Sequence, residues 1–275
     1  MRLRALRSGV EVVYSGWGGV SGASGLRSPM NSRDFVARNS EFYDAFWALT
    51  YLTRPERFNT WPMISALLPA ASARLEIGPG LRPRLPVAGT HFLDLSPLVI
   101  RRLNARGGLA RHGEITAPPY ADGQFDLVTV FDVIEHVVDD RRVFTELTRV
   151  LKPGGRLIFS VPLHAAHWTA FDDCVGHVRR YEPGALRELI ASHGLVVERS
   201  AVFGMQSNNP RLLDHSARWL TQHRTAAVRL YNWLLFPLGL LLQQRLKFTE
   251  GLMDLAGIHE VLLVCRRAAP AADAT

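Results

Sequence analysis

ARLEIGPG, at residues 73–80, joins a short apolar strand to a turn made of Gly78, Pro79 and Gly80. The two glycines leave no side chain where a backbone has to approach a ligand closely. In an open α/β sheet, ligands bind beyond the carboxyl ends of the parallel strands, at the point where the strand order reverses. The stretch therefore predicts a nucleotide site at this turn, within an α/β domain.

Strands and helices alternate on either side of this turn. Strands are expected at 73–78, 90–95, 109–114, 125–131, 156–162, 195–203 and 259–267. Helices are expected at 39–51, 59–68, 97–106, 140–151 and 183–193. The alternation predicts an α/β fold with a doubly wound, mostly parallel sheet of seven strands and a helical insertion before the last strand.

The chain divides into regions of different character. We expect a disordered leader at 1–29, N-terminal cover helices at 30–69, a core at 70–203, a helical insertion at 204–257, a last core strand at 258–267 and a tail at 268–275. The leader is rich in Gly, Ser and Arg and has no helical or strand periodicity. Its only apolar stretch is interrupted by Glu11 and is too short for a signal-peptide core.

Composition excludes several classes of protein. The 275 residues carry 32 Lys and Arg against 25 Asp and Glu, a formal charge of +7, of which residues 1–29 hold +3 and residues 204–247 hold +5. The rest is close to neutral, so the central domain has no charge pattern for a nucleic-acid groove. Cys174 and Cys265 are the only cysteines, which excludes a disulfide scaffold and a four-cysteine zinc module. No apolar run approaches the ~20 residues of a membrane-spanning helix.

An acidic residue ends the second strand, fourteen positions after Gly80. The carboxylate of Asp94 can accept hydrogen bonds from both hydroxyls of a ribose, and Glu76 stands just before the glycine turn. A nicotinamide-dependent dehydrogenase shares both features. A sharp turn followed by a helix-capping Asp94 explains them without any ligand.

Four motifs in order resemble the class I S-adenosylmethionine-dependent methyltransferase family. LEIGPG resembles the first motif, LDLS the second, HGEITAPPYADGQFDLV the third, and FDVIEHVVDDRRVFTELTRVLKPGGRLIFSVP the stretch that follows. The resemblance spans roughly residues 70–203 and implies a Rossmann-like fold whose last strand inserts antiparallel. It also implies S-adenosylmethionine binding by Glu76, Gly78, Gly80, Asp94, Leu95, Glu114, Ile115 and Asp132. Arg82 stands where the family often has a third glycine.

Histidines and carboxylates gather after the fourth and fifth strands. Asp132, Glu135 and His136 are spaced i, i+3, i+4, so a helical turn would place them on one face. With His177 they are candidate ligands for a divalent metal, as in the ubiquinone-pathway and small-RNA O-methyltransferases that this pattern resembles. A metal is not the favoured interpretation. Instead we predict His136 as the catalytic base, with Tyr43, His164 and His177 as substrate contacts.

The insertion contains LYNWLLFPLGLLL at 230–242, which is apolar around the whole helix. Arg229, Arg245 and Lys247 flank it, so a peripheral membrane contact through 229–247 and a buried lid or homodimer helix are both open. The favoured function is cytoplasmic S-adenosylmethionine-dependent methylation of a small, hydrophobic or lipid-linked acceptor, at oxygen. The alternatives are a regulatory subunit that binds the cofactor without catalysis, and an RNA-directed methyltransferase; nucleic acid is not the favoured partner.

Overall fold

The computed structural model describes residues 43, 44, 46–204 and 210–269. The predicted leader at 1–29 and most of the predicted tail lie outside the described residues. Within them, one mixed sheet has the strand order β3-β2-β1-β4-β5-β8-β6-β7. The strands are β1 (Arg74–Ile77), β2 (His91–Asp94), β3 (Leu109–His112), β4 (Phe125–Val130), β5 (Leu151–Pro162), β6 (Leu195–Val202), β7 (Thr249–Glu250) and β8 (Glu260–Arg267).

The α/β fold predicted from the alternation is confirmed, with one difference. The sheet has eight strands instead of seven, because the two residues of β7 pair with the edge of β6. β8 lies between β5 and β6 and is antiparallel to both, as the family resemblance implied. The first five strands are parallel to one another, so their carboxyl ends meet at one edge of the sheet.

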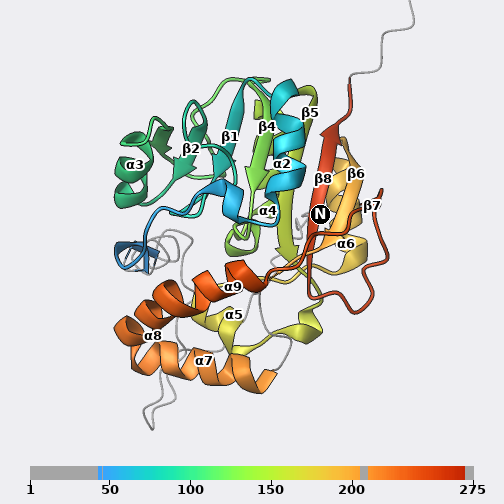
Figure 1. Cartoon of the computed structure of the whole chain (residues 1–275). Coiled ribbons are helices and arrows are strands. Elements are labelled where there is room, and N and C mark those ends of the chain that lie inside the picture. Colours follow the sequence, from blue (N-terminus) through green and yellow to red (C-terminus); the bar gives the residue numbers. More distant parts are fainter. Residues whose placement is uncertain (1–42, 45, 205–209, 270–275) are drawn as a thin grey trace, which may run out of the picture.

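Helices cover both faces of the sheet (Figure 1). One face carries α2 (Trp61–Leu67), and the other carries α4 (Asp140–Val150) and α6 (Pro183–Ser192). α3 (Pro97–Asn104) joins β2 to β3. Buried strands explain this sandwich: Leu262 and Val264 of β8 pack on the α2 side, whereas Leu263 and Cys265 pack on the side of α4 and α6. A strand covered on both faces reads as a continuous apolar run, which is the pattern of β4, β5 and β8.

Several helices lie beyond the carboxyl ends of the parallel strands (Figure 1). They are α5 (Ala170–Val175), α7 (Pro210–Gln222), α8 (Arg224–Leu230), the π-helical turn η5 (Tyr231–Leu235) and α9 (Phe236–Leu242). Four short 3₁₀ turns complete the described elements: η1 (Pro55–Arg57), η2 (Leu68–Ala70), η3 (Ile134–His136) and η4 (Ala165–His167). In the helix expected at 39–51, residues 43, 44 and 46–48 are helical among those described.

α8, η5 and α9 run on as one helix from Arg224 to Leu242, longer than the apolar stretch read from the sequence. By length and composition alone, this helix would be long enough to cross a membrane. Nineteen residues at 1.5 Å each span ~28 Å, against ~20 Å for residues 230–242 alone. The expectation that no segment approaches membrane length therefore has to be corrected, because α8 extends the apolar stretch toward its N-terminus.

Candidate functional site

The glycine turn and Asp94 lie against each other, as the sequence predicted. The backbone N–H of Gly80 donates to Oδ2 of Asp94 over 3.1 Å, and the N–H of Ser96 donates to Oδ1 over 2.8 Å. Burial raises the pKa of Asp94 to about 6, although these backbone hydrogen bonds act in the opposite direction. Each carboxylate oxygen keeps a free lone pair, so Asp94 can still accept two hydroxyl groups.

Both glycines of the turn are required by backbone conformation and by space. Gly78 and Gly80 have φ values of +63° and +53°, in the left-handed region that other residues rarely adopt. A Cβ on Gly78 would lie 2.5 Å from Cγ2 of Val133, and one on Gly80 would lie 2.0 Å from Cζ2 of Trp47. Trp47, from the N-terminal helical residues, therefore covers the turn directly.

Glu76 supports the loop that follows the turn. Its carboxylate oxygens accept the backbone N–H groups of Arg84 and Leu85 over 2.8 and 2.9 Å. Burial raises the pKa of Glu76 to about 7 despite these hydrogen bonds. Its two oxygens are thus already engaged in holding the loop, at the base of the cavity described next.

A cavity of about 2010 Å³ runs from the glycine turn to the histidines. Every residue predicted to bind the cofactor lines it: Glu76, Gly78, Gly80, Asp94, Leu95, Glu114, Ile115 and Asp132. A buried carboxylate with spare acceptor capacity, beside a turn with two glycines, matches what an adenosine ribose needs. The residues present therefore fit S-adenosylmethionine.

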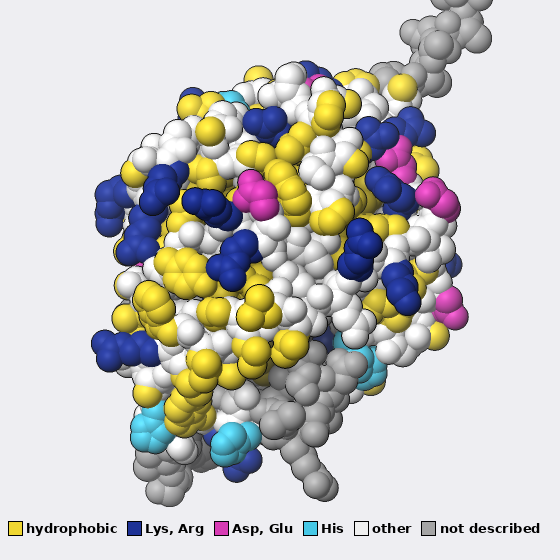
Figure 2. Space-filling view, in the orientation of Figure 1, with side chains coloured by type: hydrophobic (Ala, Val, Ile, Leu, Met, Phe, Trp, Pro, Cys, Tyr) yellow, Lys and Arg dark blue, Asp and Glu magenta, His cyan; other side chains and the backbone are white. Residues whose placement is uncertain are grey.

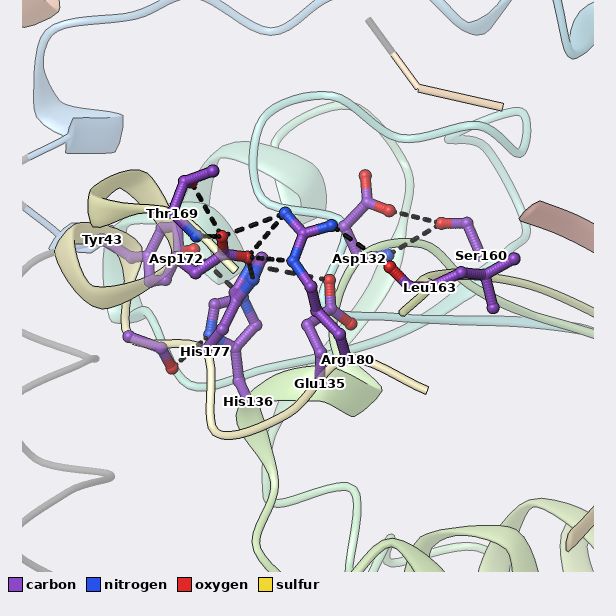
Figure 3. A network of polar contacts seen from close by, with 11 residues as sticks. Tyr43, Asp132, Glu135, His136, Ser160, Leu163, Thr169, Asp172, His177 and Arg180 are labelled. Atoms are coloured by element: carbon purple, nitrogen blue, oxygen red, sulfur yellow. Dashed lines mark hydrogen bonds and ion pairs between the residues drawn. The ribbon is translucent and has the colours of Figure 1, made fainter. Parts of the chain in front are cut away.

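At the far end of the cavity, Glu135, His136 and His177 form one cluster (Figure 3). One potential ligand atom from each residue lies within 4.8 Å of the other two. Nδ1 of His136 donates to the carbonyl of Gly176 over 2.9 Å, because a carbonyl oxygen can only accept. Nε2 of the neutral ring then carries a lone pair, and burial together with His177 lowers the pKa of His136 to about 3.

His177 has the same arrangement with a carboxylate as its partner. Its Nδ1 lies 2.8 Å from Oδ1 of Asp172, and its Nε2 lies 3.8 Å from Oε1 of Glu135. Oε2 of Glu135 is buried and has no hydrogen-bond partner among the described residues. Two imidazoles held by their Nδ1 atoms, with the Glu135 carboxylate close to both, form a donor set that suits a divalent cation.

Asp172 fixes the position of His177 in this cluster (Figure 3). Arg180 donates to it through Nε and Nη2 over 2.9 and 3.0 Å, and Thr169 donates from its backbone N–H and its hydroxyl. Burial alone would raise the pKa of Asp172, but the hydrogen bonds from His177 and Arg180 hold it well below its usual range. Asp172 was not predicted from the sequence. The spacing of Thr169 and Asp172 as a capping box was the available signal, although it points to a helix start and not to a histidine partner.

The predicted helical face of Asp132, Glu135 and His136 does not form. Asp132 has a left-handed φ of +53°, and only Ile134–His136 form a single 3₁₀ turn. The hydroxyl of Ser160 donates to Oδ1 of Asp132 over 2.5 Å, on the side away from the histidines (Figure 3). Asp132 is therefore not part of the cluster of candidate metal ligands, because the chain turns at Asp132 before the 3₁₀ turn begins at Ile134.

The predicted substrate contacts divide into two groups. Tyr43 lies over the cluster, with its hydroxyl 3.4 Å from Nε2 of His136, and burial raises the pKa of Tyr43. His177 lines the cavity, as does His136. His164 differs: its Nε2 bonds to the carbonyl of Leu255 over 2.9 Å, and it is not one of the described residues that line the cavity. Its backbone has a positive φ of +59°, and its role as a substrate contact stays a prediction.

Arg82 lines the cavity and is engaged with the insertion. Its Nη2 donates to Oδ1 of Asn232 over 2.6 Å, and its guanidinium carbon lies 3.6 Å from the ring centroid of Phe236. Burial lowers the pKa of Arg82. The residue that replaces the family's third glycine thus ties the loop to the insertion.

Comparison with known proteins agrees with this geometry. Residues 77–159 match the family described as "Methyltransferase domain". Over 90 residues the chain is 34% identical to a protein of Mycolicibacterium smegmatis named "Probable S-adenosylmethionine-dependent methyltransferase", covering 32% of this chain and 35% of that one. Over 64 residues it is 39% identical to a "Demethylmenaquinone methyltransferase" of Mycolicibacterium paratuberculosis, covering 22% and 28%. The chain thus spans about a third of the length of these curated relatives.

The fold has a counterpart among solved structures. A Thermotoga maritima protein described as "SAM-dependent methyltransferase, possible histamine N-methyltransferase" has a TM-score of 0.50 and 16% sequence identity. The alignment covers 85% of this chain and 96% of that one. At this identity the likeness establishes the arrangement of strands and helices.

Proposed function

Since the chain belongs to the class I S-adenosylmethionine-dependent methyltransferase family, we propose that it transfers a methyl group from S-adenosylmethionine to an oxygen atom of a small hydrophobic molecule. The observation that carries this proposal is the contact between Gly80 and Asp94 at the carboxyl ends of β1 and β2, beside the point between β1 and β4 where the strand order reverses. Bound S-adenosylmethionine supplies a sulfonium methyl group with a neutral leaving group. The protein's own task is then to align the acceptor and to handle its proton.

A hydrophobic acceptor is supported by the walls of the cavity between Asp94 and the insertion. Large aromatic side chains line the cavity, namely Phe46, Phe58, Phe131, Trp168, Tyr231 and Phe236. Apolar walls with a few placed polar groups are the usual character of a small-molecule pocket. An elongated acceptor would lie along these apolar walls, with its reactive hydroxyl at the histidines.

Methylation at oxygen is supported by the lone pairs at the cluster. A hydroxyl acceptor must lose its proton, and Nε2 of His136 faces the cavity as a neutral hydrogen-bond acceptor. With a pKa of about 3, His136 is a weak base on its own. We therefore propose that Glu135, His136 and His177 would hold a divalent cation, with the Nε2 lone pair of His136 as one ligand, and that this cation would bind and acidify the acceptor hydroxyl.

Calorimetry tests cofactor binding directly. The wild type should bind S-adenosylmethionine and its demethylated product but not NAD. Asp94→Asn should weaken both by ~1–3 kcal/mol, the scale of hydrogen bonds to a charged group. Asp122→Asn is the matched control, because the side chain of Asp122 is 81% exposed and pairs with Arg149 outside the cavity. Tight binding of NAD alone would overturn the proposal.

A labelling assay tests the acceptor class. Purified protein is incubated with methyl-labelled S-adenosylmethionine and a cell extract, and the label is then measured in the organic phase, in precipitated RNA and in the aqueous phase. We expect label in the organic phase. Label in RNA, with binding that falls steeply with salt, would favour the RNA-directed alternative. Cofactor binding without any transfer would favour a regulatory subunit.

A further inference from the structure

The helix formed by α8, η5 and α9 has two distinct faces. Its inner face is buried and consists of Ala227, Val228, Asn232, Phe236 and Leu240. Phe236 packs against Phe58, and Asn232 accepts the hydrogen bond from Arg82. This face holds the helix against the core and closes one side of the cavity.

The outer face is apolar and exposed. Trp233, Leu234, Leu241 and Leu242 are 65%, 57%, 77% and 71% exposed, and Leu230, Leu235 and Leu238 are exposed beside them. Only 28% of the helix's most apolar window is buried. In Figure 2 hydrophobic side chains gather over α8 and α9, with basic side chains beside them. An apolar patch of this kind marks a surface that is covered by something else.

The charges around this outer face have one sign. Residues 215–249 contain no Asp or Glu. Arg229, Arg245 and Lys247 are exposed, and no described acidic side chain pairs with them. A cluster of cations around exposed Trp and Leu side chains complements a negatively charged lipid surface.

We propose that the outer face of residues 224–242, together with Arg245 and Lys247, binds the surface of anionic lipid bilayers. Trp233 would lie at the level of the headgroups, where indole rings with one polar edge are favoured. The neighbouring leucines would enter the acyl boundary, and the three cations would meet lipid phosphates.

Two other occupants fit the structure less well. A spanning helix would have to pull Asn232 away from Arg82, which would leave a buried guanidinium without its acceptor. A second copy of the chain, packed through the same face, would bring Arg229, Arg245 and Lys247 of both copies close to one another, and such like charges oppose association. An anionic membrane satisfies both the apolar area and the charge.

The placement of this surface connects it with the cavity. Ala227, Tyr231 and Gly239 of the same helix line the cavity, and so do Leu235 and Leu242 of the outer face and the two cations Arg245 and Lys247. A bilayer on the outer face would therefore lie one helix away from the cavity, so a hydrophobic acceptor could reach it from the lipid. This last step rests on the proposed function, whereas the membrane surface itself does not.

Vesicle cosedimentation tests the surface without any methyl transfer. The full chain is mixed with vesicles of phosphatidylcholine alone, or of equal parts phosphatidylcholine and phosphatidylglycerol, at low and high salt. We expect binding to the anionic vesicles only, weakened by salt. Trp233→Ser with Leu241→Ser should lower the partition coefficient at least about tenfold. The triple change Arg229→Gln, Arg245→Gln and Lys247→Gln should lower it on the order of 100-fold.

Matched controls use other exposed positions. Leu109→Ser with Val196→Ser removes exposed apolar side chains from β3 and β6, and Arg101→Gln, Arg106→Gln and Arg141→Gln removes three exposed cations elsewhere. Circular dichroism checks that all variants are folded. Equal binding to neutral vesicles, no binding, or variants that bind like the wild type would overturn the proposal. So would a dimer that the Trp233 and Leu241 changes dissociate, or resistance to alkaline carbonate extraction.

Discussion

Arg82 and Asn232 are 150 positions apart in the chain, yet Nη2 of the arginine donates to the amide oxygen of the asparagine over 2.6 Å. Asn232 is fully buried in the insertion, and Arg82 follows the glycine turn by two residues. This hydrogen bond joins the cofactor end of the cavity to the helix that closes it. A substitution at either residue should therefore affect both the packing of the insertion and the cofactor end of the cavity.

Asn232→Leu should destabilise the fold and weaken cofactor binding together. The substitution leaves Nη2 of the buried Arg82 guanidinium without its acceptor, which costs ~1–3 kcal/mol. Urea unfolding and calorimetry with S-adenosylmethionine measure the two effects. Arg82→Met should restore part of the lost stability in the Asn232→Leu background, since the orphaned charge is then removed. Gln222→Leu, at an exposed amide on α7, is the control and should change neither quantity.

Gly80→Ala should lower the free energy of unfolding by more than a left-handed backbone conformation explains. Gly154 has a φ of +76° and a Cβ added there would meet no atom within 4 Å, so Gly154→Ala measures the conformational cost, ~1–2 kcal/mol. At Gly80 the new methyl group also meets Trp47, 2.0 Å away. Denaturant unfolding should rank Gly80→Ala as the more destabilising. In a Trp47→Ala background, the difference in unfolding free energy between Gly80→Ala and Gly154→Ala should be smaller. An unchanged difference would contradict the contact between Gly80 and Trp47.

The affinity for S-adenosylmethionine should fall as the pH drops through about 6, the raised pKa of Asp94. A protonated carboxyl accepts hydroxyl groups less well than a carboxylate. The pKa of Asp94 is higher in the folded state than in the unfolded chain, so protonation of Asp94 raises the free energy of unfolding as the pH falls. The loss of affinity near pH 6 is therefore not caused by unfolding through this group. Calorimetry between about pH 5 and 8 measures the effect. Asp94→Asn should bind more weakly and with a flat profile; a profile with the wild-type midpoint would assign the titration to another group.

The sheet could be predicted because its information is local. Apolar runs such as 125–131 and 259–267 are buried on both faces. The glycine turn and Asp94 are only fourteen positions apart and follow two consecutive strands. The antiparallel last strand came from the family resemblance, and no periodicity would have indicated it. The two-residue β7 has no sequence signal, because any extended pair beside an open edge can form it.

The far end of the site was only partly predictable. Glu135, His136 and His177 were expected together and do meet, whereas Asp132 bonds to Ser160 and His164 to the carbonyl of Leu255, and both have a positive φ. A non-glycine residue with a positive φ is uncommon, so a helical spacing argument could not foresee it. The Asp172 and Asn232 contacts depend on how distant segments pack, which no local pattern encodes.

The cluster should bind a divalent cation. Calorimetry of the metal-free protein with Mn²⁺, Co²⁺ and Zn²⁺ should detect a single site that is lost in His177→Ala and retained in His112→Ala, an exposed histidine on β3. Chelation should then lower methyl transfer while S-adenosylmethionine still binds, because Asp94 lies at the other end of the cavity. Binding of equal strength in His177→Ala would exclude this site.

Asp172→Asn should be the most destabilising single change at the cluster. The carboxylate accepts from Arg180 and His177 while fully buried, and removing one partner of a buried charge pair costs about 3–5 kcal/mol. Asp173→Asn is the control on the same helix, because Asp173 is less buried and accepts from Trp168 only at 3.2 Å. The pKa of Asp172 is depressed, so its contribution is present above the unfolded pKa of about 4 and is lost as the pH falls toward the lower folded value. Urea unfolding should therefore show a large difference between wild type and Asp172→Asn at about pH 7 and a smaller one at about pH 3. A difference that stays constant across this range would mean that the charge of Asp172 does not carry the effect.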